Sequence, residues 1–153
     1  MDEESTLTLT LSHPSGPRPV PGLLPTGVVA THSSRFLVPA ADASARRAQM
    51  VVGSLLRLVV GADEGADRTV RDVGFCLAEL VAAATRSVPG GDLLCEVRVD
   101  GEHVHFSVEY SDPLPARARE RATGLDRLDG YIDGCGMHAD AGTRQVWASV
   151  RRS

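Results

Sequence analysis

The stretch AELVAAATRS, residues 78–87, holds an acid at a position where it could do chemistry. Glu79 is the only acid in it. Residues four apart on a helix share a face, so Glu79 and Ala83 project together beside an apolar stripe. A carboxylate on a helix surface needs no catalytic explanation, so both interpretations of Glu79 stay open.

Two other groups contain residue types that bind metals. His103 and His105 share one face of a predicted strand hairpin with Glu96, as a metal-binding pair would. Two solvated histidines are the alternative. Cys135 and His138 have C-x-x-H spacing but no second pair, which argues against a zinc site.

Composition limits the class of protein. The 153 residues suffice for one domain, and the formal net charge of -4 argues against a nucleic-acid partner. We find no apolar run of membrane-spanning length and no basic segment before an apolar one, so we expect a cytoplasmic protein without a membrane partner. The 3 cysteines are widely spaced and odd in number, which predicts reduced thiols.

Proline and glycine separate a tail from the domain. Residues 1–33 interleave prolines with glycines, which predicts a disordered tail, and residues 34–153 form the domain. RFLVPA (35–40) predicts a strand, after which Asp42 or Ser44 can cap a helix. A second helix is expected from about residue 66 to 87. Helical spacing predicts the buried residues Ala45, Ala48, Val52, Leu55, Leu56 and Val59, then Val70, Val73, Leu77, Leu80, Val81 and Ala84.

A hairpin is expected in LLCEVRVDGEHVHFSVEYSD (93–112). Asp100-Gly101 predicts a two-residue turn, which places Glu96 opposite His105 and Arg98 opposite His103. One face is then apolar: Cys95, Val97, Val99, Val104, Phe106 and Val108.

The rest of the chain completes the order β-α-α-β-β-α-β-β. Residues 124–131 predict a short helix, and GCGMHADAG and TRQVWASV predict two strands. This order predicts an α+β fold, a two-layer sandwich of a mixed, mostly antiparallel sheet with helices on one face. A loop before the last helix carries a basic patch, which could be solvated or contact phosphate or an acidic partner: Arg117, Arg119, Arg121 and Arg127.

The element order and five short motifs together resemble the ATP-binding domain of gyrase-type ATPases, histidine kinases and anti-sigma-factor serine kinases, the Bergerat fold. The greatest similarity is to the small anti-sigma-kinase-like regulators of actinomycetes, over about residues 35–151. The motifs are RFLVPAADASARRA, LAELVAAATRS, VEYSDPLP, ATGLDRL and AGTRQVWASV.

The resemblance implies catalytic and metal positions on the second helix. Glu79 would polarise the attacking hydroxyl or water. The family places a magnesium-binding Asn four residues later, where this chain has Ala83. The implied cofactors are ATP and Mg²⁺, and Ala83 argues against retention of the metal.

The resemblance also implies nucleotide-binding positions. Asp112 would accept a hydrogen bond from the adenine amino group, and Thr143 would close the adenine pocket. Gly124 keeps one glycine of the phosphate-side pair, but Ala122 and Leu114 stand where the family has glycine. A strand-end turn residue and a surface Thr are the structural alternatives for Asp112 and Thr143.

Two functions follow as hypotheses. The first, which we prefer, is a regulator of the anti-sigma type that binds a sigma factor or an anti-sigma antagonist, with weak or lost ATP binding. The second is an active ATP-dependent serine kinase that phosphorylates such an antagonist, with Glu79 as its catalytic residue. A stand-alone nucleotide-binding domain is a third possibility. The family often dimerises, so a homodimer is expected by analogy.

Overall fold

The computed structural model describes residues 32–88, 90–111, 125–140 and 142–153. The predicted tail therefore falls largely outside the described residues, although residues 32 and 33 already belong to the first strand. No helix in the described ranges is both long enough and apolar enough to cross a membrane.

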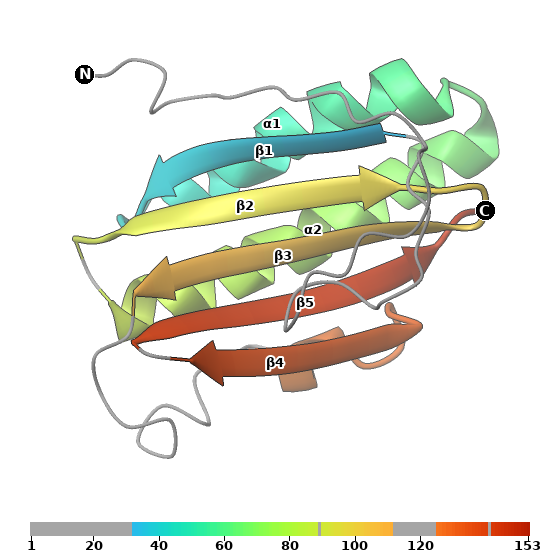
Figure 1. The fold of residues 1–153 in the computed structure, drawn as a ribbon. Helices are drawn as coiled ribbons and strands as arrows, with labels where there is room; N and C mark the ends of the chain where they lie inside the picture. The colour runs from blue at the N-terminus through green and yellow to red at the C-terminus, as the bar shows by residue number, and fades with distance from the viewer. Residues whose placement is uncertain (1–31, 89, 112–124, 141) are drawn as a thin grey trace.

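The chain forms two long helices, one short 3-10 helix and five strands in the expected order (Figure 1). The short helix expected at 124–131 is a 3-10 turn rather than an α-helix. The elements are β1 (His32–Pro39), α1 (Ser44–Val60), α2 (Glu64–Ser87), β2 (Asp92–Val99), β3 (His103–Ser111), η2 (Leu125–Leu128), β4 (Gly134–Asp140) and β5 (Thr143–Arg151).

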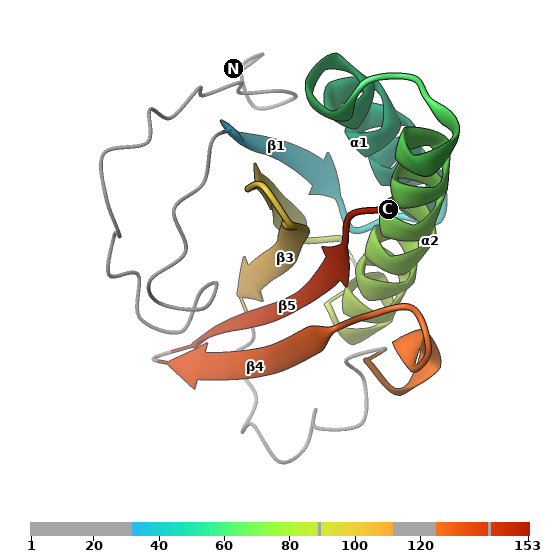
Figure 2. The same ribbon diagram turned by 90° about the vertical axis from the view of Figure 1, so that its right-hand side faces the viewer.

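The strands form one sheet in the order β1-β2-β3-β5-β4, and α1 and α2 cover one of its faces (Figure 2). This confirms the α+β two-layer sandwich. All pairings among the described strands are antiparallel, so the sheet has no mixed portion there. Since side chains alternate along each strand, the sheet has an apolar face covered by α1 and α2 and a polar face that no described helix covers, called the open face below.

α2 buries its whole predicted stripe, whereas Ala45, Leu55 and Val59 of the α1 stripe are only partly buried. Val52 and Leu56 of α1 and Leu77 and Leu80 of α2 are at most 1% exposed. They pack against the apolar face of the sheet, whose most central strand contributes Phe106, fully buried. The helical periodicity thus predicted that α1 and α2 form the layer that packs on the sheet.

The helix starts differ from expectation. The residue preceding α1 is Ala43, which makes no capping bond, and Ser44 Oγ donates instead to the Pro39 carbonyl. The prediction of Asp42 or Ser44 as the cap is therefore wrong. α2 begins two residues earlier than expected because Asp63 accepts a 2.7 Å hydrogen bond from the Ala66 N–H.

The predicted β2–β3 register is also wrong, although the predicted faces are right. Arg98 lies opposite His105, and Val99 lies opposite Val104. The cause is Asp100, whose Oδ1 accepts the backbone N–H of Glu102 and of His103. This side-chain-stabilised turn lengthens the loop. The pairing moves by two residues, an even number, so no side chain changes face.

Truncation of the α2 stripe tests this packing. Leu77→Ala removes a fully buried side chain, so we expect the free energy of unfolding to fall by about 2–5 kcal/mol. Leu58→Ala on α1, where the side chain is 83% exposed, should change it by less than about 0.5 kcal/mol. Urea titration followed by circular dichroism measures both. Equal losses in the two variants would contradict the assignment of α2 as the core helix.

Candidate functional site

The α2 face on which the resemblance places a catalytic Glu and a metal-binding Asn presents one carboxylate and the buried methyl group of Ala83. Glu79 Oε1 lies 3.4 Å from Arg127 Nε of η2, and the Glu79 side chain is 24% exposed. Ala83, one turn later, is 1% exposed. The helix therefore brings positions 79 and 83 to one face as predicted, but the second position has neither an oxygen ligand nor open space.

The predicted nucleotide-binding residues are only partly described. Asp112 and Gly124 lie outside the described residues. Thr143 begins β5, opposite Ser111 of β3 and Asp140 of β4.

Thr143 lies on the open face of the sheet by strand alternation, whereas Glu79 lies on the helix that covers the other face. Thr143 lines a cavity of about 160 Å³ together with Leu37, Asp92, Leu94, Glu109, Tyr110 and Ser111. Pockets for drug-sized ligands start at about 300 Å³. The structure therefore does not join Glu79 and Thr143 in one described pocket.

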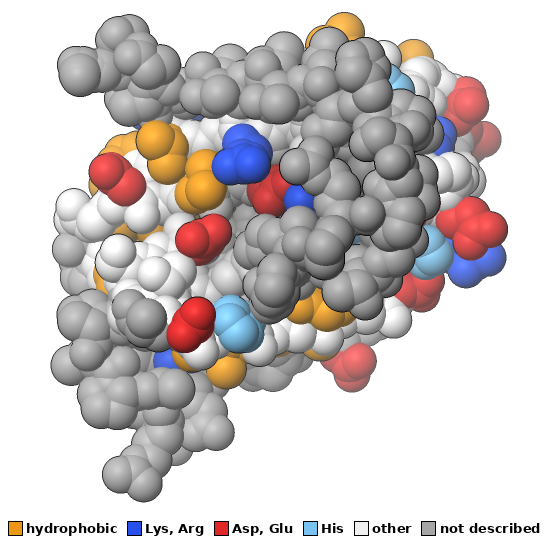
Figure 3. Space-filling model, in the orientation of Figure 1, with side chains coloured by type: hydrophobic (Ala, Val, Ile, Leu, Met, Phe, Trp, Pro, Cys, Tyr) orange, Lys and Arg blue, Asp and Glu red, His pale blue; other side chains and the backbone are white. Residues whose placement is uncertain are grey.

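The open face carries charged side chains of both signs (Figure 3). Several of its polar residues are nevertheless buried: Glu96, His105, Ser107, Gln145 and Ser149. Arg98 Nε donates to Glu96 Oε2 at 2.8 Å, which pairs the charge of this buried acid.

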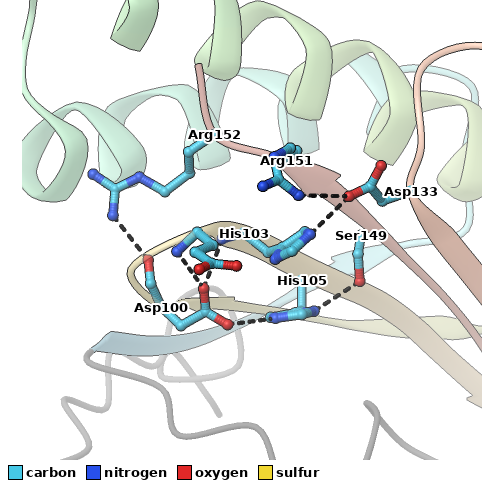
Figure 4. A network of polar contacts seen from close by, with 8 residues as sticks. Asp100, His103, His105, Asp133, Ser149, Arg151 and Arg152 are labelled. Carbon is cyan, nitrogen blue, oxygen red and sulfur yellow. Dashed lines mark hydrogen bonds and ion pairs between the residues drawn. The ribbon is translucent and has the colours of Figure 1, made fainter.

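A polar network at one end of this face connects the β2–β3 turn to β5 (Figure 4). His105 Nε2 lies 2.9 Å from Asp100 Oδ2, and His105 Nδ1 lies 2.7 Å from Ser149 Oγ. The guanidinium of Arg152 donates to the Asp100 carbonyl at 2.8 Å. Sequence reasoning placed Asp100 in the turn but missed its role as the partner of His105.

His103 belongs to the same network through a second acid. Its Nε2 lies 2.7 Å from Asp133 Oδ2, and Arg151 approaches the same oxygen at 3.8 Å. The two histidine rings lie with centroids 5.7 Å apart, but each has its own carboxylate partner. Within the described ranges, no group of three His, Cys, Asp or Glu side chains could hold a metal ion. Glu96, predicted to lie opposite His105, instead lies opposite Ser107.

Asp100, His105 and Ser149 have the residue types of an acid–base–nucleophile relay. His105 and Ser149 are 5% and 4% exposed, so the Ser149 hydroxyl is closed to a substrate in this structure. The relay therefore acts as a structural bridge that holds the turn against β5.

Hydrogen bonding sets the ionisation of Asp100. Burial alone would raise its pKa. The hydrogen bonds from His105 and from the N–H groups of Glu102 and His103 outweigh this effect and hold the pKa below its ordinary value.

The thiols fall into two classes. Burial raises the pKa of Cys76 to about 12, with a smaller contribution from Asp72 and Glu79, and burial alone raises the pKa of Cys95 to about 12. Cys135, in β4, is exposed. All three are free, as predicted, and only Cys135 is placed to react.

Comparison with known proteins leaves the family open. No family model matches the chain, and no curated protein matches its sequence.

Removal of the Asp100 charge tests the polar network. Because the pKa of Asp100 is lower in the folded chain, its contribution to stability is present above the unfolded value, near 3.9, and is lost as pH falls through the folded value. We expect Asp100→Asn to lower the free energy of unfolding by about 1 kcal/mol at pH 7.

Thermal melts of both proteins between pH 7 and pH 3 should therefore converge at the acid end. Asp42→Asn, at an exposed position, serves as the control. A constant difference between the Asp100 variant and the unmodified protein at every pH would refute the electrostatic explanation.

Thiol titration with an aromatic disulfide reagent tests the burial of the cysteines. At pH 8, we expect one thiol of the native protein to react rapidly, because only Cys135 is exposed, and all three to react in denaturant. Cys135→Ser should abolish the rapid reaction. Rapid reaction of a second thiol in the native protein would show that the core opens at Cys76 or Cys95.

Proposed function

We propose that this protein is a regulator of the anti-sigma type that works by binding another protein, with weak or lost binding of Mg²⁺–ATP. The observation that carries the proposal is the α2 face at positions 79 and 83. There, a carboxylate already paired with Arg127 stands beside the sealed methyl group of Ala83.

The ion pair of Glu79 with Arg127 argues against a role of Glu79 as a catalytic base. The guanidinium of Arg127 lies within ion-pair distance of Glu79, at 3.4 Å. In such a pair, the guanidinium competes with a hydroxyl or water for the same carboxylate oxygen atoms. Arg127 is 65% exposed, so the pair is weak and a strong ligand could displace it.

The buried methyl group of Ala83 argues more strongly against the binding of Mg²⁺. Mg²⁺ needs nearly ideal octahedral oxygen coordination and takes few ligands from protein, so one missing oxygen matters. At 1% exposure, Ala83 also leaves no space for a water that could replace the missing amide.

The outward face of α1 supports a protein-binding role. Arg46 and Arg47 are exposed at its start, and Met50 and Leu58 are 64% and 83% exposed further along. A face that combines basic and apolar side chains suits an acidic protein partner with apolar anchors. A sigma factor or an anti-sigma antagonist is the partner class that the resemblance implies.

The active kinase remains the alternative because Glu79 is retained on the α2 face. It requires the metal to be held by Glu79, water and phosphate oxygens alone. Binding measurements separate the two functions.

Calorimetric titration of ATP, with and without Mg²⁺, tests the proposal. We expect the unmodified protein to show no Mg²⁺-dependent binding, because the metal lacks its side-chain oxygen at position 83. Ala83→Asn supplies that oxygen, and a gain of Mg²⁺-dependent affinity in this variant would show that the buried position can open to the metal and that the missing oxygen causes the loss. Ala82→Asn, one residue away and half-buried, is the matched control and should restore nothing.

Tight Mg²⁺-dependent binding by the unmodified protein would overturn the loss of the metal site and favour the kinase. The partner is tested separately with purified sigma factors and anti-sigma antagonists from the same organism. We expect one of them to bind with an affinity that ATP and Mg²⁺ leave unchanged. Arg46→Glu with Arg47→Glu should weaken this binding at least ~10-fold.

A further inference from the structure

The two edges of the sheet differ in how they are protected. β1 forms one edge, carries the exposed Arg35 and ends in Pro39. β4 forms the other edge and pairs only with β5 among the described strands. Charged residues and proline are the usual protection of an edge strand, because its unpaired backbone groups invite another strand. β4, with the sequence GCGMHAD, has no proline, Lys or Arg, and its one acid is the terminal Asp140.

Exposed apolar side chains gather beside this unprotected edge. On the helix side of β4, Met137 is 39% exposed, and Cys135 and Ala139 are exposed as well. Tyr131, just before β4, is 46% exposed and contacts the ring of Phe75, with centroids 4.9 Å apart. Three of the five large exposed hydrophobic residues in the described ranges thus belong to this region.

The sequence of β4 is complementary to itself. If a second copy of β4 is placed antiparallel, with a two-fold axis at Met137, all seven residues of the strand find a partner. Cys135 then faces Ala139 of the second copy, and Met137 faces its own copy. His138 faces Gly136, and Asp140 faces Gly134, so no like charges stand opposite each other.

This register also keeps the two-layer architecture. Directly opposed residues in an antiparallel pair point to the same face of the sheet. Met137 meets Met137, so the helices of both copies lie on one side, and the apolar residues Cys135, Met137 and Ala139 form a continuous cluster. A shift by one residue would place the helix layers on opposite sides.

From these observations, we propose that β4 is a self-association edge, through which two copies of this chain join their five-stranded sheets into one ten-stranded sheet. The proposal concerns the backbone edge of β4 and does not depend on whether ATP is bound. The occupant is a second copy rather than another protein, because the register pairs every residue of β4 without a charge conflict.

Disulfide cross-linking of the full chain tests the register. In the Ala139→Cys variant, the new thiol lies directly opposite Cys135 of the second copy, within the reach of a disulfide. We expect mild oxidation to give a covalent dimer. In the unmodified protein, the two Cys135 residues lie four positions apart along the paired strands, about 14 Å, and should not join.

The combination of Ala139→Cys with Cys135→Ser is the matched control. It keeps the new thiol but removes the residue opposite, so we expect no covalent dimer. Cross-linking that is equal in this control, or equal in the unmodified protein, would overturn the register.

Sedimentation across a range of protein concentrations tests the association itself. We expect a dimer that Met137→Lys weakens at least ~10-fold, because two ammonium groups would meet at the axis. Met50→Lys makes the same chemical change on α1, at a side chain that is 64% exposed, and should leave the dimer unchanged. A protein that is monomeric at every concentration, or a dimer that is indifferent to Met137→Lys, would refute the proposal.

Discussion

The packing of α2 against the apolar face of the sheet is the constraint on which the other features depend. Leu77 and Leu80 are buried beneath the helix, and Phe106 and Val108 are buried on β3 beneath them. Burial of this apolar area is the main stabilising term available to a chain with only 4% aromatic residues. It fixes the rotation of α2, and this rotation decides where Glu79 and Ala83 point.

The same packing leaves the opposite face of the sheet to polar side chains. Strand alternation puts Glu96, His105 and Ser149 on that face, and all three are buried. Buried polar atoms need partners, and Arg98, Asp100 and the His105–Ser149 contact provide them. The polar network is therefore a consequence of the sheet pattern rather than evidence of catalysis, even though it contains Ser, His and Asp.

The sequence was sufficient to predict the element order, the helix stripes and the faces of the hairpin, because each follows from periodicity over many residues. It was not sufficient for features that depend on one side chain. The β2–β3 register depends on Asp100 Oδ1, which accepts two backbone N–H groups, and the start of α2 depends on Asp63. Glu79 and Ala83 were correctly predicted to share one face of the helix. The pairing of Glu79 with Arg127 was not predicted, because Arg127 lies 48 residues later in the chain and no local pattern reveals such a contact.

These constraints leave different parts of the surface available for different functions. On the α2 face, Ala83 is buried, and Glu79 has only a weak ion-pair partner in the exposed Arg127. On the open sheet face, Glu96, His105 and Ser149 are engaged in their own hydrogen bonds. The outward side of α1 and the edge strand β4 are more accessible: Leu58 is 83% exposed, and Met137 is 39% exposed although its Sδ accepts a 2.9 Å hydrogen bond from Arg144 Nη1. β4 pairs on one side only among the described strands. Exposed apolar surface of this kind suits contact with another protein, whereas a small molecule needs an enclosing pocket. The packing that buries Ala83 therefore also favours a role in protein association.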